Sequence, residues 1–514
     1  MNEQKANGKL SFGELFKDCL TTVDERVVFN MLIGGMWVPS SSSKVIEVNS
    51  PIDGSLVACV QAGTKKDVDN AVKAAHEARG RIREIPAIDR IDMLNKARHI
   101  MRDNYDVFVR TLVMESGKTV AQAQAEVNSA MNRIKMTMEE ARSIFGEYVP
   151  GDWSEDTMAK FALVIREPIG VIACVSPFNY PLFSMVAKVI PAIVSGNAVV
   201  MKPSTDDPIQ AILLARVLQQ SGLPPGVVNV ITGRGGEVGD ELVSHELVGM
   251  VTLTGSTETG RHVASLTGMK KVHLELGGKG AAIVTRSADL SLAGRKVLEG
   301  CFKYSGQRCD AISRVLVEKD VKGQFLGELL KEYDNWKVGN PWDKTVNMGP
   351  LINERAAERV QSLVNDAIEK GAVLVRGGKH RGTYFEPTVL DSVPLQARIA
   401  WEETFGPVVA IIDVSDVDEA IEVVNRSRYG LDSCVFTNDF YVAWKVAKGL
   451  QEGSITVNDA PSHGVGYFPF GGNKDSGIGR EGVGYSIDEM TRIKTISFNL
   501  APAGLGKTRK IQRM

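Results

Sequence analysis

Three side chains in the sequence have the chemistry needed for nucleophilic catalysis: a cysteine, a glutamate and an asparagine. Cys309 ends the segment YSGQRC, where the neighbouring guanidinium of Arg308 favours the thiolate, the nucleophilic form of cysteine. The same segment could begin a helix, whose amino end would favour the thiolate further. The alternative is a small buried hydrophobic side chain, and we assign that role to Cys301, which lacks such neighbours.

Glu275 and Asn179 fit the roles of a base and of an oxyanion donor. Glu275 lies in the apolar segment HLELGG, where burial would raise the pKa of its carboxyl toward that of a useful general base. Asn179 follows a segment expected to be a buried strand, and an amide fixed in the loop SPFNYP suits an oxyanion hole. The alternatives are a structural carboxylate paired with a lysine or arginine, and an asparagine that only holds a turn.

Two glycine-containing turns and a lysine could bind the phosphates and ribose of a dinucleotide. In LTGSTETG a strand ends at Thr254, Gly255 and Ser256 and a helix opens, whose free N–H groups and dipole favour a phosphate. The loop TGRGGEVGD has glycines two and then four residues apart, one residue longer than the usual dinucleotide fingerprint. Lys202 ends another strand and can reach a ribose hydroxyl or a phosphate. Ordinary strand-to-helix turns and solvated helix caps look similar.

Strand and helix patterns alternate along the chain from residue 164 onward. The segments VIACVSP, NAVVMKPS, VVNVITG and MVTLTGS predict strands, with helical patterns of apolar residues between them. A second alternating series begins near Gly277. Such alternation indicates parallel sheets with helices on both faces, in which ligands lie at the carboxyl ends of strands. We therefore predict an α/β protein with two Rossmann-like domains.

The order of these patterns predicts how the chain is divided. The segment GEYVPGDWSEDTMAKFALVIREP predicts two strands that leave the first sheet, and TRIKTISFN predicts an isolated strand near the end of the chain. A partner subunit could cover the unpaired edges of these strands. We predict a dinucleotide-binding domain formed by residues 26–146 and 168–275, and a catalytic domain formed by residues 276–470. Residues 147–167 and 484–499 would be oligomerisation strands, and residues 1–25 and 500–514 would be terminal extensions.

Composition argues against several classes of protein. The 514-residue chain is too long for one core, and its net charge of −2 makes nucleic acid a poor candidate as the main partner. The six cysteines form no CxxC pattern, so we expect no metal site and no disulfide framework. The start carries no export signal, and the one uncharged run of membrane length, 169–187, is broken by glycine and prolines. We expect a cytoplasmic protein with no membrane partner.

Six features in a fixed order resemble the aldehyde dehydrogenase family: Asn179, Lys202 and the motifs LTGSTETG, LELGGK, GQRC and EETFGPV. The spacings agree from LIGGMWV to KTISFN, and Glu275 and Cys309 lie 34 residues apart (309 minus 275), as in that family. The segments YVPGDWS, YSGQRCDAI and HGVGYFPFGGNKDSGIGREGVGYSI resemble the archaeal type of non-phosphorylating glyceraldehyde-3-phosphate dehydrogenase. This resemblance implies an aldehyde dehydrogenase-like fold.

The resemblance implies a reaction through a covalent intermediate. Cys309 would attack the aldehyde carbon, and the Asn179 amide and the Cys309 backbone N–H would hold the oxyanion. Hydride transfer to the nicotinamide would leave a thioester, which water activated by Glu275 would hydrolyse to the acid. The presence of Glu275 argues against a rival reaction in which coenzyme A takes the acyl group, and the three residues together argue against a catalytically silent relative.

The resemblance also implies a cofactor site. Lys202, Ser204 and Thr205 would hold the adenosine end, and Glu403 and Phe405 would lie beside the nicotinamide. NAD-using relatives commonly have a glutamate at the position of Thr205, and that glutamate would repel a 2′-phosphate. Because this chain has threonine there, NADP is favoured and NAD is the alternative. The full set of cofactor-binding candidates is Ser176, Pro177, Phe178, Lys202, Ser204, Thr205, Gly235, Gly239, Thr254, Gly255, Ser256, Leu276, Glu403 and Phe405.

The substrate is inferred from residues that could bind its phosphate. The resemblance assigns Arg308 and Tyr180 to this role, with Arg133 and His463 as further candidates. Ser462 and His463 stand where archaeal relatives tend to have Arg-His, so one cation is missing. The leading hypothesis is oxidation of D-glyceraldehyde 3-phosphate to 3-phosphoglycerate; the alternative is glyceraldehyde, lactaldehyde or another small hydroxy- or semialdehyde. A homotetramer, as a dimer of dimers, is expected.

Overall fold

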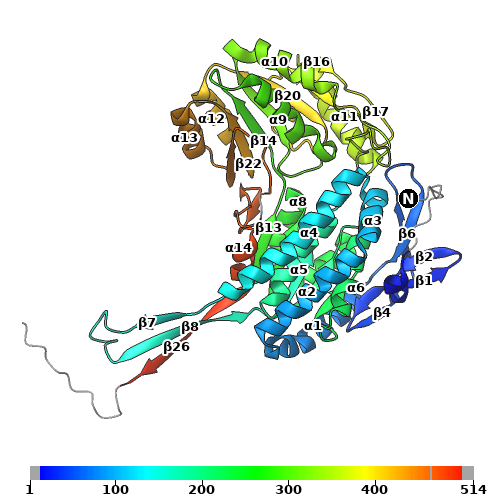
Figure 1. Ribbon diagram of the computed structural model, residues 1–514, viewed down its shortest axis with the longest axis vertical. Helices are drawn as coiled ribbons and strands as arrows, with labels where there is room; N and C mark the ends of the chain where they lie inside the picture. Colours follow the sequence, from blue (N-terminus) through cyan, green and yellow to red (C-terminus); the bar gives the residue numbers. More distant parts are fainter. Residues whose placement is uncertain (1–11, 464–465, 501–514) are drawn as a thin grey trace, which may run out of the picture.

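The computed structural model describes residues 12–463 and 466–500, which form two α/β lobes and a projecting β sheet (Figure 1). The first lobe is built on an eight-stranded sheet. Its five central strands are parallel, and each of the three outer strands pairs antiparallel with its inner neighbour. In spatial order the strands are β25 (Gly477–Ile478), β13 (Lys271–Glu275), β12 (Met250–Thr254), β9 (Val171–Val175), β10 (Ala198–Lys202), β11 (Val228–Val230), β3 (Met31–Ile33) and β4 (Met36–Val38).

Helices cover both faces of this sheet, because its central strands are apolar on both sides. Along β10, Val199 and Met201 join one apolar cluster, whereas Ala198 and Val200 join the other, as the two-residue period of a strand requires. The first cluster includes residues of α2 to α6 and the second includes residues of α1, α7 and α8. The helices are α1 (Lys65–Glu84), α2 (Ala87–Asp103), α3 (Tyr105–Ser116), α4 (Val120–Glu140), α5 (Pro181–Val194), α6 (Ile209–Gln220), α7 (Asp240–Ser244) and α8 (Thr257–Leu266).

The second lobe has a seven-stranded sheet, parallel except for the edge strand β16. Strand β13 of the first sheet ends at Glu275, and the next strand, β14, begins at Gly280 in the second sheet. In spatial order the strands are β16 (Val373–Arg376), β19 (Thr388–Asp391), β20 (Val408–Val414), β15 (Ile312–Glu318), β14 (Gly280–Val284), β22 (Asp432–Phe436) and β23 (Ser454–Val457), and the helices are α9 (Leu290–Phe302), α10 (Lys319–Tyr333), α11 (Glu354–Glu369), α12 (Val417–Asn425) and α13 (Phe440–Gly449).

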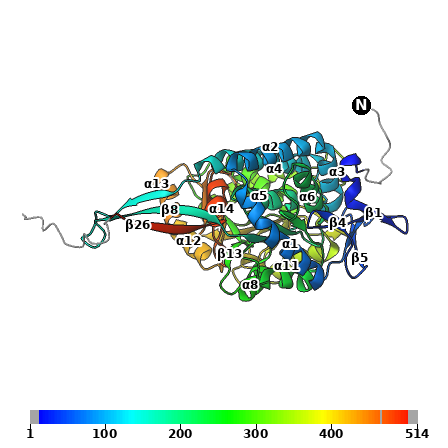
Figure 2. The ribbon, with the colours of Figure 1, turned by 90° about the horizontal axis from the view of Figure 1, so that it is seen from below.

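Three antiparallel strands, β7 (Glu147–Pro150), β8 (Lys160–Pro168) and β26 (Thr491–Asn499), project from the body (Figures 1 and 2). The late strand is shorter than the predicted 484–499. The earlier part of that range lies in helix α14 (Val483–Glu489), which packs on α5 and buries Val483 and Ile487. This burial needs the first lobe as a partner, so the local sequence alone did not indicate a helix.

The amino-terminal segment also differs from the expected extension. Residues 14–23 form a 3₁₀ helix, η1 (Glu14–Cys19), and strand β1 (Leu20–Val23), and Phe16 and Cys19 are buried in the first lobe. Strand β1 joins a four-stranded sheet in the order β1-β2-β6-β5, with β2 (Arg26–Phe29), β6 (Leu56–Gln61) and β5 (Val45–Asn49). Within the described residues, no helix has both the length and the apolarity needed to cross a membrane.

The remaining elements are short. They are η2 (Ala141–Ser143), η3 (Gly235–Gly239), η4 (Lys303–Gly306), η5 (Arg398–Ala400), the pair β17 (His380–Arg381) and β18 (Tyr384–Phe385), and the pair β21 (Tyr429–Gly430) and β24 (Asn473–Lys474).

Candidate active site

A cavity of about 560 Å³ brings together segments that are far apart in the sequence. Helices α4 and α5 and the ends of β12 and β13 line it from the first lobe, and the loop before β15 lines it from the second. All seven residues predicted for catalysis or substrate binding line this one cavity: Arg133, Asn179, Tyr180, Glu275, Arg308, Cys309 and His463. The structure therefore gathers the predicted nucleophile, base, oxyanion donor and cations at a single place.

Cys309 lies in a tight loop between η4 and β15. Tyr304 and Ser305 have left-handed backbone angles (φ 52° and 53°), and Gly306 follows with φ 73°. A Cβ atom on Gly306 would lie 2.3 Å from the Gly406 carbonyl oxygen, so glycine is required there. No helix begins at Cys309, so the expected help from a helix amino end is wrong; the chain continues through a turn into the strand instead.

The surroundings of Cys309 keep its side chain as a thiol. Burial, followed by the carboxylates of Asp310, Glu275 and Glu403, raises the pKa of the thiol well above its ordinary value, and Arg308 opposes this only partly. The guanidinium of Arg308 is itself paired, because its Nε donates to Asp310 Oδ1 at 3.0 Å. Arg308 therefore favours the thiolate, as expected, but burial and the carboxylates outweigh it, and the partly exposed thiol must lose its proton to react.

Glu275 ends strand β13 with its carboxyl group buried. Burial raises the pKa of this carboxyl, as predicted, and the hydrogen bond from His273 opposes the rise. Oε1 of Glu275 is 3.0 Å from Nε2 of His273, whereas Oε2 has no hydrogen-bond partner among the described residues. A buried carboxylate with one free oxygen in the cavity that also holds Cys309 suits a base acting on a thiol or a water molecule.

Asn179 connects the first lobe to the loop that carries the cysteine. Its Nδ2 donates to the carbonyl oxygen of Gln307 at 2.9 Å, and the residue is buried. A side-chain amide has two N–H donors, so one is left for an oxygen atom in the cavity. This arrangement fits an oxyanion donor whose position is fixed relative to Cys309.

Glu481 is a buried carboxylate that sequence reasoning did not single out. Its oxygens lie 3.9 Å from Lys188 Nζ, 3.8 Å from Arg133 Nη2 and 3.9 Å from His463 Nε2. Burial alone would raise its pKa, but these neighbours, Lys188 foremost, outweigh burial and lower it to about 2. Lys188 could have been noticed as the only charge in the apolar helix segment PLFSMVAKVIPAIV, whereas nothing local distinguishes Glu481.

Acidic and imidazole groups gather next to Glu275. One ligand-type atom from each of His273, Glu275 and Glu481 lies within 4.8 Å of the others. Lys188 and Arg133 already neutralise Glu481, so a metal cation would have to displace both of them. We therefore assign these atoms to hydrogen bonds and ion pairs.

The two arginines that were predicted to bind the substrate already bind groups of the protein. Arg133 Nη1 donates to the Gly466 carbonyl oxygen at 3.3 Å, and Arg308 Nη2 donates to the Pro461 carbonyl oxygen at 3.3 Å. His463 stacks on Phe470 at 4.0 Å, and burial lowers the pKa of its imidazole, which favours the neutral ring. Lys118 is a further cation in this region that the sequence did not reveal. Its Nζ lies 3.9 Å from the centre of the Tyr180 ring, in a cation–π contact.

The predicted cofactor residues lie along the carboxyl ends of neighbouring parallel strands, β9, β10, β12 and β13. Burial lowers the pKa of Lys202 to about 8, and its Nζ donates only to the Pro203 carbonyl oxygen among the described residues, at 3.0 Å. The hydroxyls of Ser176 and Thr254 are buried with no partner in the described part of the chain. Unsatisfied donors at strand ends, beside the amino end of α8 that Ser256 caps, fit the phosphates and ribose of a dinucleotide.

The other cofactor candidates contact residues close to these strand ends. Glu403 accepts a hydrogen bond from the backbone N–H of Gly278 at 3.1 Å, and Phe405 contacts Phe178 edge to face with ring centres 5.7 Å apart. Leu276 fills the space beside Gly260, where a Cβ atom would lie 2.3 Å from its Cδ2. A Cβ atom on Gly235 would meet no other atom within 4 Å. A Cβ atom on Gly239 would meet only the Lys202 side chain, so there is room beside that lysine.

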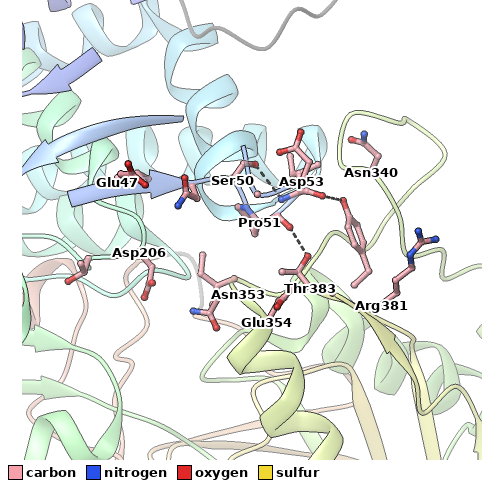
Figure 3. A pocket seen from close by; sticks show the side chains of 18 of the residues that line it. Glu47, Ser50, Pro51, Asp53, Asp206, Asn340, Asn353, Glu354, Arg381 and Thr383 are labelled. Carbon is pink, nitrogen blue, oxygen red and sulfur yellow. Dashed lines mark hydrogen bonds between the residues drawn. The ribbon is translucent and has the colours of Figure 1, made fainter. Parts of the chain in front are cut away.

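A second cavity, of about 1100 Å³, lies beside Thr205, one of the residues predicted to hold the adenosine end (Figure 3). Thr205, Asp206 and Arg234 line it together with the turn between β5 and β6 and loops of the second lobe. Thr383 Oγ1 donates to the Pro51 carbonyl oxygen at 2.6 Å, so the lobes touch across it. Thr205 Oγ1 donates to the Gly233 carbonyl oxygen at 3.2 Å, which joins the two predicted cofactor loops.

The comparisons with known proteins agree with this geometry. Residues 37–496 match the model of the aldehyde dehydrogenase family. The chain is 39% identical to an NADP-dependent glyceraldehyde-3-phosphate dehydrogenase of Streptococcus equinus, over 91% of this chain and 98% of that protein. It is 35% identical to a 3-sulfolactaldehyde dehydrogenase of Priestia aryabhattai, over 94% and 100%. The crystal structure of NADP-dependent glyceraldehyde-3-phosphate dehydrogenase from Bacillus halodurans C-125, complexed with NADP, superposes with a TM-score of 0.90 at 38% identity, over 92% and 99%.

Proposed function

This chain belongs to the aldehyde dehydrogenase family, and we propose that it oxidises D-glyceraldehyde 3-phosphate to 3-phosphoglycerate with NADP as the electron acceptor. The observation that carries the proposal is the cavity in which Cys309 lies with two guanidinium groups, those of Arg133 and Arg308. Arginine binds phosphate through several N–H donors in a fixed plane. The NADP-dependent glyceraldehyde-3-phosphate dehydrogenases among the relatives support the same substrate.

The proposed reaction uses Cys309, Glu275 and Asn179 in sequence. The Cys309 sulfur bonds to the aldehyde carbon while the thiol proton is released to solvent, and the Asn179 amide stabilises the oxyanion. Bound NADP would supply the two-electron acceptor for the hydride that leaves this carbon. Water then attacks the thioester, Glu275 takes its proton, and that proton returns to the departing sulfur as the acid is released.

We favour NADP because of the residues at the adenosine end. Lys202 is a buried cation at the end of β10, and Thr205 is uncharged where an acid would repel a 2′-phosphate. Thr205 also bonds the loop that carries Arg234, so a second cation borders this region. NAD is the alternative, because Asp206 is exposed beside Thr205 and would partly offset these cations.

A second candidate substrate is an aldehyde with less charge. Each guanidinium in the cavity already faces a carboxylate, since Arg308 pairs with Asp310 and Arg133 lies against Glu481. His463 contributes little positive charge because burial lowers the pKa of its ring. Glyceraldehyde, lactaldehyde or another small hydroxy- or semialdehyde would need fewer free cations than a phosphate does.

Steady-state kinetics with D-glyceraldehyde 3-phosphate, glyceraldehyde and lactaldehyde, each with NADP and NAD, test the proposal. We expect kcat/KM for the phosphorylated aldehyde to exceed that for glyceraldehyde at least tenfold, on the order of the 1.4 kcal/mol that one charge-assisted contact supplies. Equal values would refute phosphate recognition. The Cys309→Ala variant must form no reduced cofactor with any of these substrates, and turnover by it would refute the proposed nucleophile.

We also propose that the chain forms a homotetramer, as a dimer of dimers, through the projecting sheet. Apolar side chains remain exposed on it, among them Tyr148 and Ile493, and β7 and β26 are its outer strands. Light scattering on the purified protein would give the mass. A monomer at micromolar concentration would refute this proposal.

A further inference from the structure

His273 lies next to the proposed base because of strand geometry. Side chains two residues apart on a strand share a face, so His273 and Glu275 of β13 point the same way. Nε2 of His273 lies 3.0 Å from Oε1 of Glu275, and both residues are buried. The hydrogen bond leaves Oε2 of Glu275 as the oxygen without a partner among the described residues.

The other ring nitrogen of His273 is held by Glu489. Nδ1 of His273 is hydrogen-bonded to Oε2 of Glu489, at the end of helix α14. The remaining oxygen of Glu489 accepts from the backbone N–H of Arg480 at 3.0 Å, and a Cβ atom on Gly479 would lie 2.6 Å from it. The Glu489 side chain is 23% exposed, so it is the only one of the three groups that meets solvent. An imidazole between two carboxylates has donors on both nitrogens when it is protonated.

We propose that His273, held by Glu489 as an imidazolium, is a positioning residue that orients Glu275 and keeps it ionised in the buried cavity. The inference rests on the proposed function of Glu275 as the base for thioester hydrolysis. Fixing Oε1 through His273 turns Oε2 toward the cavity that holds Cys309. Positive charge next to a buried carboxylate offsets the desolvation that would otherwise protonate it.

The charges around the pair are consistent with this role. Burial lowers the pKa of His273, but the hydrogen bonds and charges of Glu275 and Glu489 outweigh it and raise the pKa to about 9. Glu481 faces Glu275 and raises the pKa of that carboxyl, whereas Lys188 of α5 lowers it. On the side of Glu489 lies Lys271, and the guanidinium of Arg480 is turned away to the carbonyl oxygens of Gly472 and Gly479.

The experiment measures the two halves of the reaction separately in the full-length enzyme. Rapid mixing with NADP and an aldehyde that is turned over gives a burst of NADPH for acylation, followed by a steady rate limited by thioester hydrolysis. The hydrolysis rate is recorded from pH 5.5 to 9.5 for wild type, His273→Leu, His273→Gln and Glu489→Gln. Asp488→Asn serves as the matched control, because Asp488 is exposed and pairs with Arg166. If none of the three aldehydes gave NADPH with the wild type, the proposed function would be refuted instead.

We expect His273→Leu to keep the burst while the acid limb of hydrolysis moves up by about one pH unit or more, because Glu275 loses its neighbouring positive charge. His273→Gln retains a donor without charge and should show the same shift with a smaller loss of maximal rate. Glu489→Gln should shift the limb in the same direction by less, and Asp488→Asn should not shift it. A normal burst with an unshifted limb in His273→Leu would overturn the inference, as would loss of the burst and of hydrolysis to the same extent.

Discussion

Replacing Glu481 with glutamine tests whether this one carboxylate neutralises the cations at the back of the cavity. Lys188, Arg133 and His463 surround it and lower its pKa from the ordinary 4.5 to about 2. The difference of about 2.5 pH units corresponds to roughly 3 kcal/mol of stability from the ionised group. Loss of one partner from a buried ion pair costs a similar amount, about 3–5 kcal/mol, because the other charges are left unpaired.

The dependence on pH has a definite sign. Because the folded pKa is depressed, the contribution is fully present above the unfolded pKa and is lost as pH falls from about 4.5 toward 2. Urea unfolding of wild type and Glu481→Gln at pH 7 should therefore differ by about 3 kcal/mol, and the difference should narrow to about 2 kcal/mol at pH 3.5. The same variant should lower the pKa of Glu275, since Glu481 raises it, and so move the acid limb of hydrolysis down.

Glu139→Gln is the matched control for this prediction. Glu139 belongs to an exposed ion pair with Lys135 on α4, and its replacement should change the free energy of unfolding by less than about 0.5 kcal/mol. A cost for Glu481→Gln no larger than that of the control would refute the reasoning. A cost that stays the same between pH 7 and pH 3.5 would show that the loss comes from packing, not from charge.

Further predictions concern the base, the cofactor and a buried acid pair. Glu275→Gln should form the thioester but hydrolyse it at least a hundredfold more slowly, on the order of the effect of a general base. One acyl adduct should therefore accumulate and be visible by mass spectrometry. Hydrolysis at the wild-type rate would rule out Glu275 as the base. Thr205→Glu should lower kcat/KM with NADP at least tenfold more than with NAD, about 1.4 kcal/mol of repulsion of a 2′-phosphate, and an unchanged ratio would exclude this position from cofactor choice. Burial and Glu115 raise the pKa of Asp207, and burial raises that of Glu115 to about 7. A carboxyl group whose pKa is raised by folding lowers the stability of the folded state as pH rises. The free energy of unfolding of Asp207→Asn should therefore exceed that of wild type by on the order of 2 kcal/mol at pH 8, and the difference should vanish toward pH 5. A difference that stays constant with pH would contradict the raised pKa.

The α/β fold was predictable because strand and helix periodicities are local properties of the sequence. The alternating strands and helices of the first lobe follow the predicted order. Helix α14 and the packed segment 14–23 were not predicted, because each is stabilised by contacts with a distant part of the first lobe. Propensity over seven or ten residues is too weak to decide such elements without their packing partners.

Residue type and order by themselves determined the chemistry available to this protein: a cysteine, an asparagine and a glutamate, with glycine-rich strand ends for a dinucleotide. The tertiary structure decided their protonation and pairing. It encloses the partly exposed Cys309 among carboxylates, which keep it a resting thiol. It pairs Arg308 with Asp310 and Arg133 with Glu481, and it places His273 between Glu275 and Glu489. Sequence could not reveal these states, because a pKa depends on burial and on charges within a few ångströms, and some of these neighbours, such as Glu489 for His273 and Glu481 for Arg133, lie hundreds of residues away along the chain.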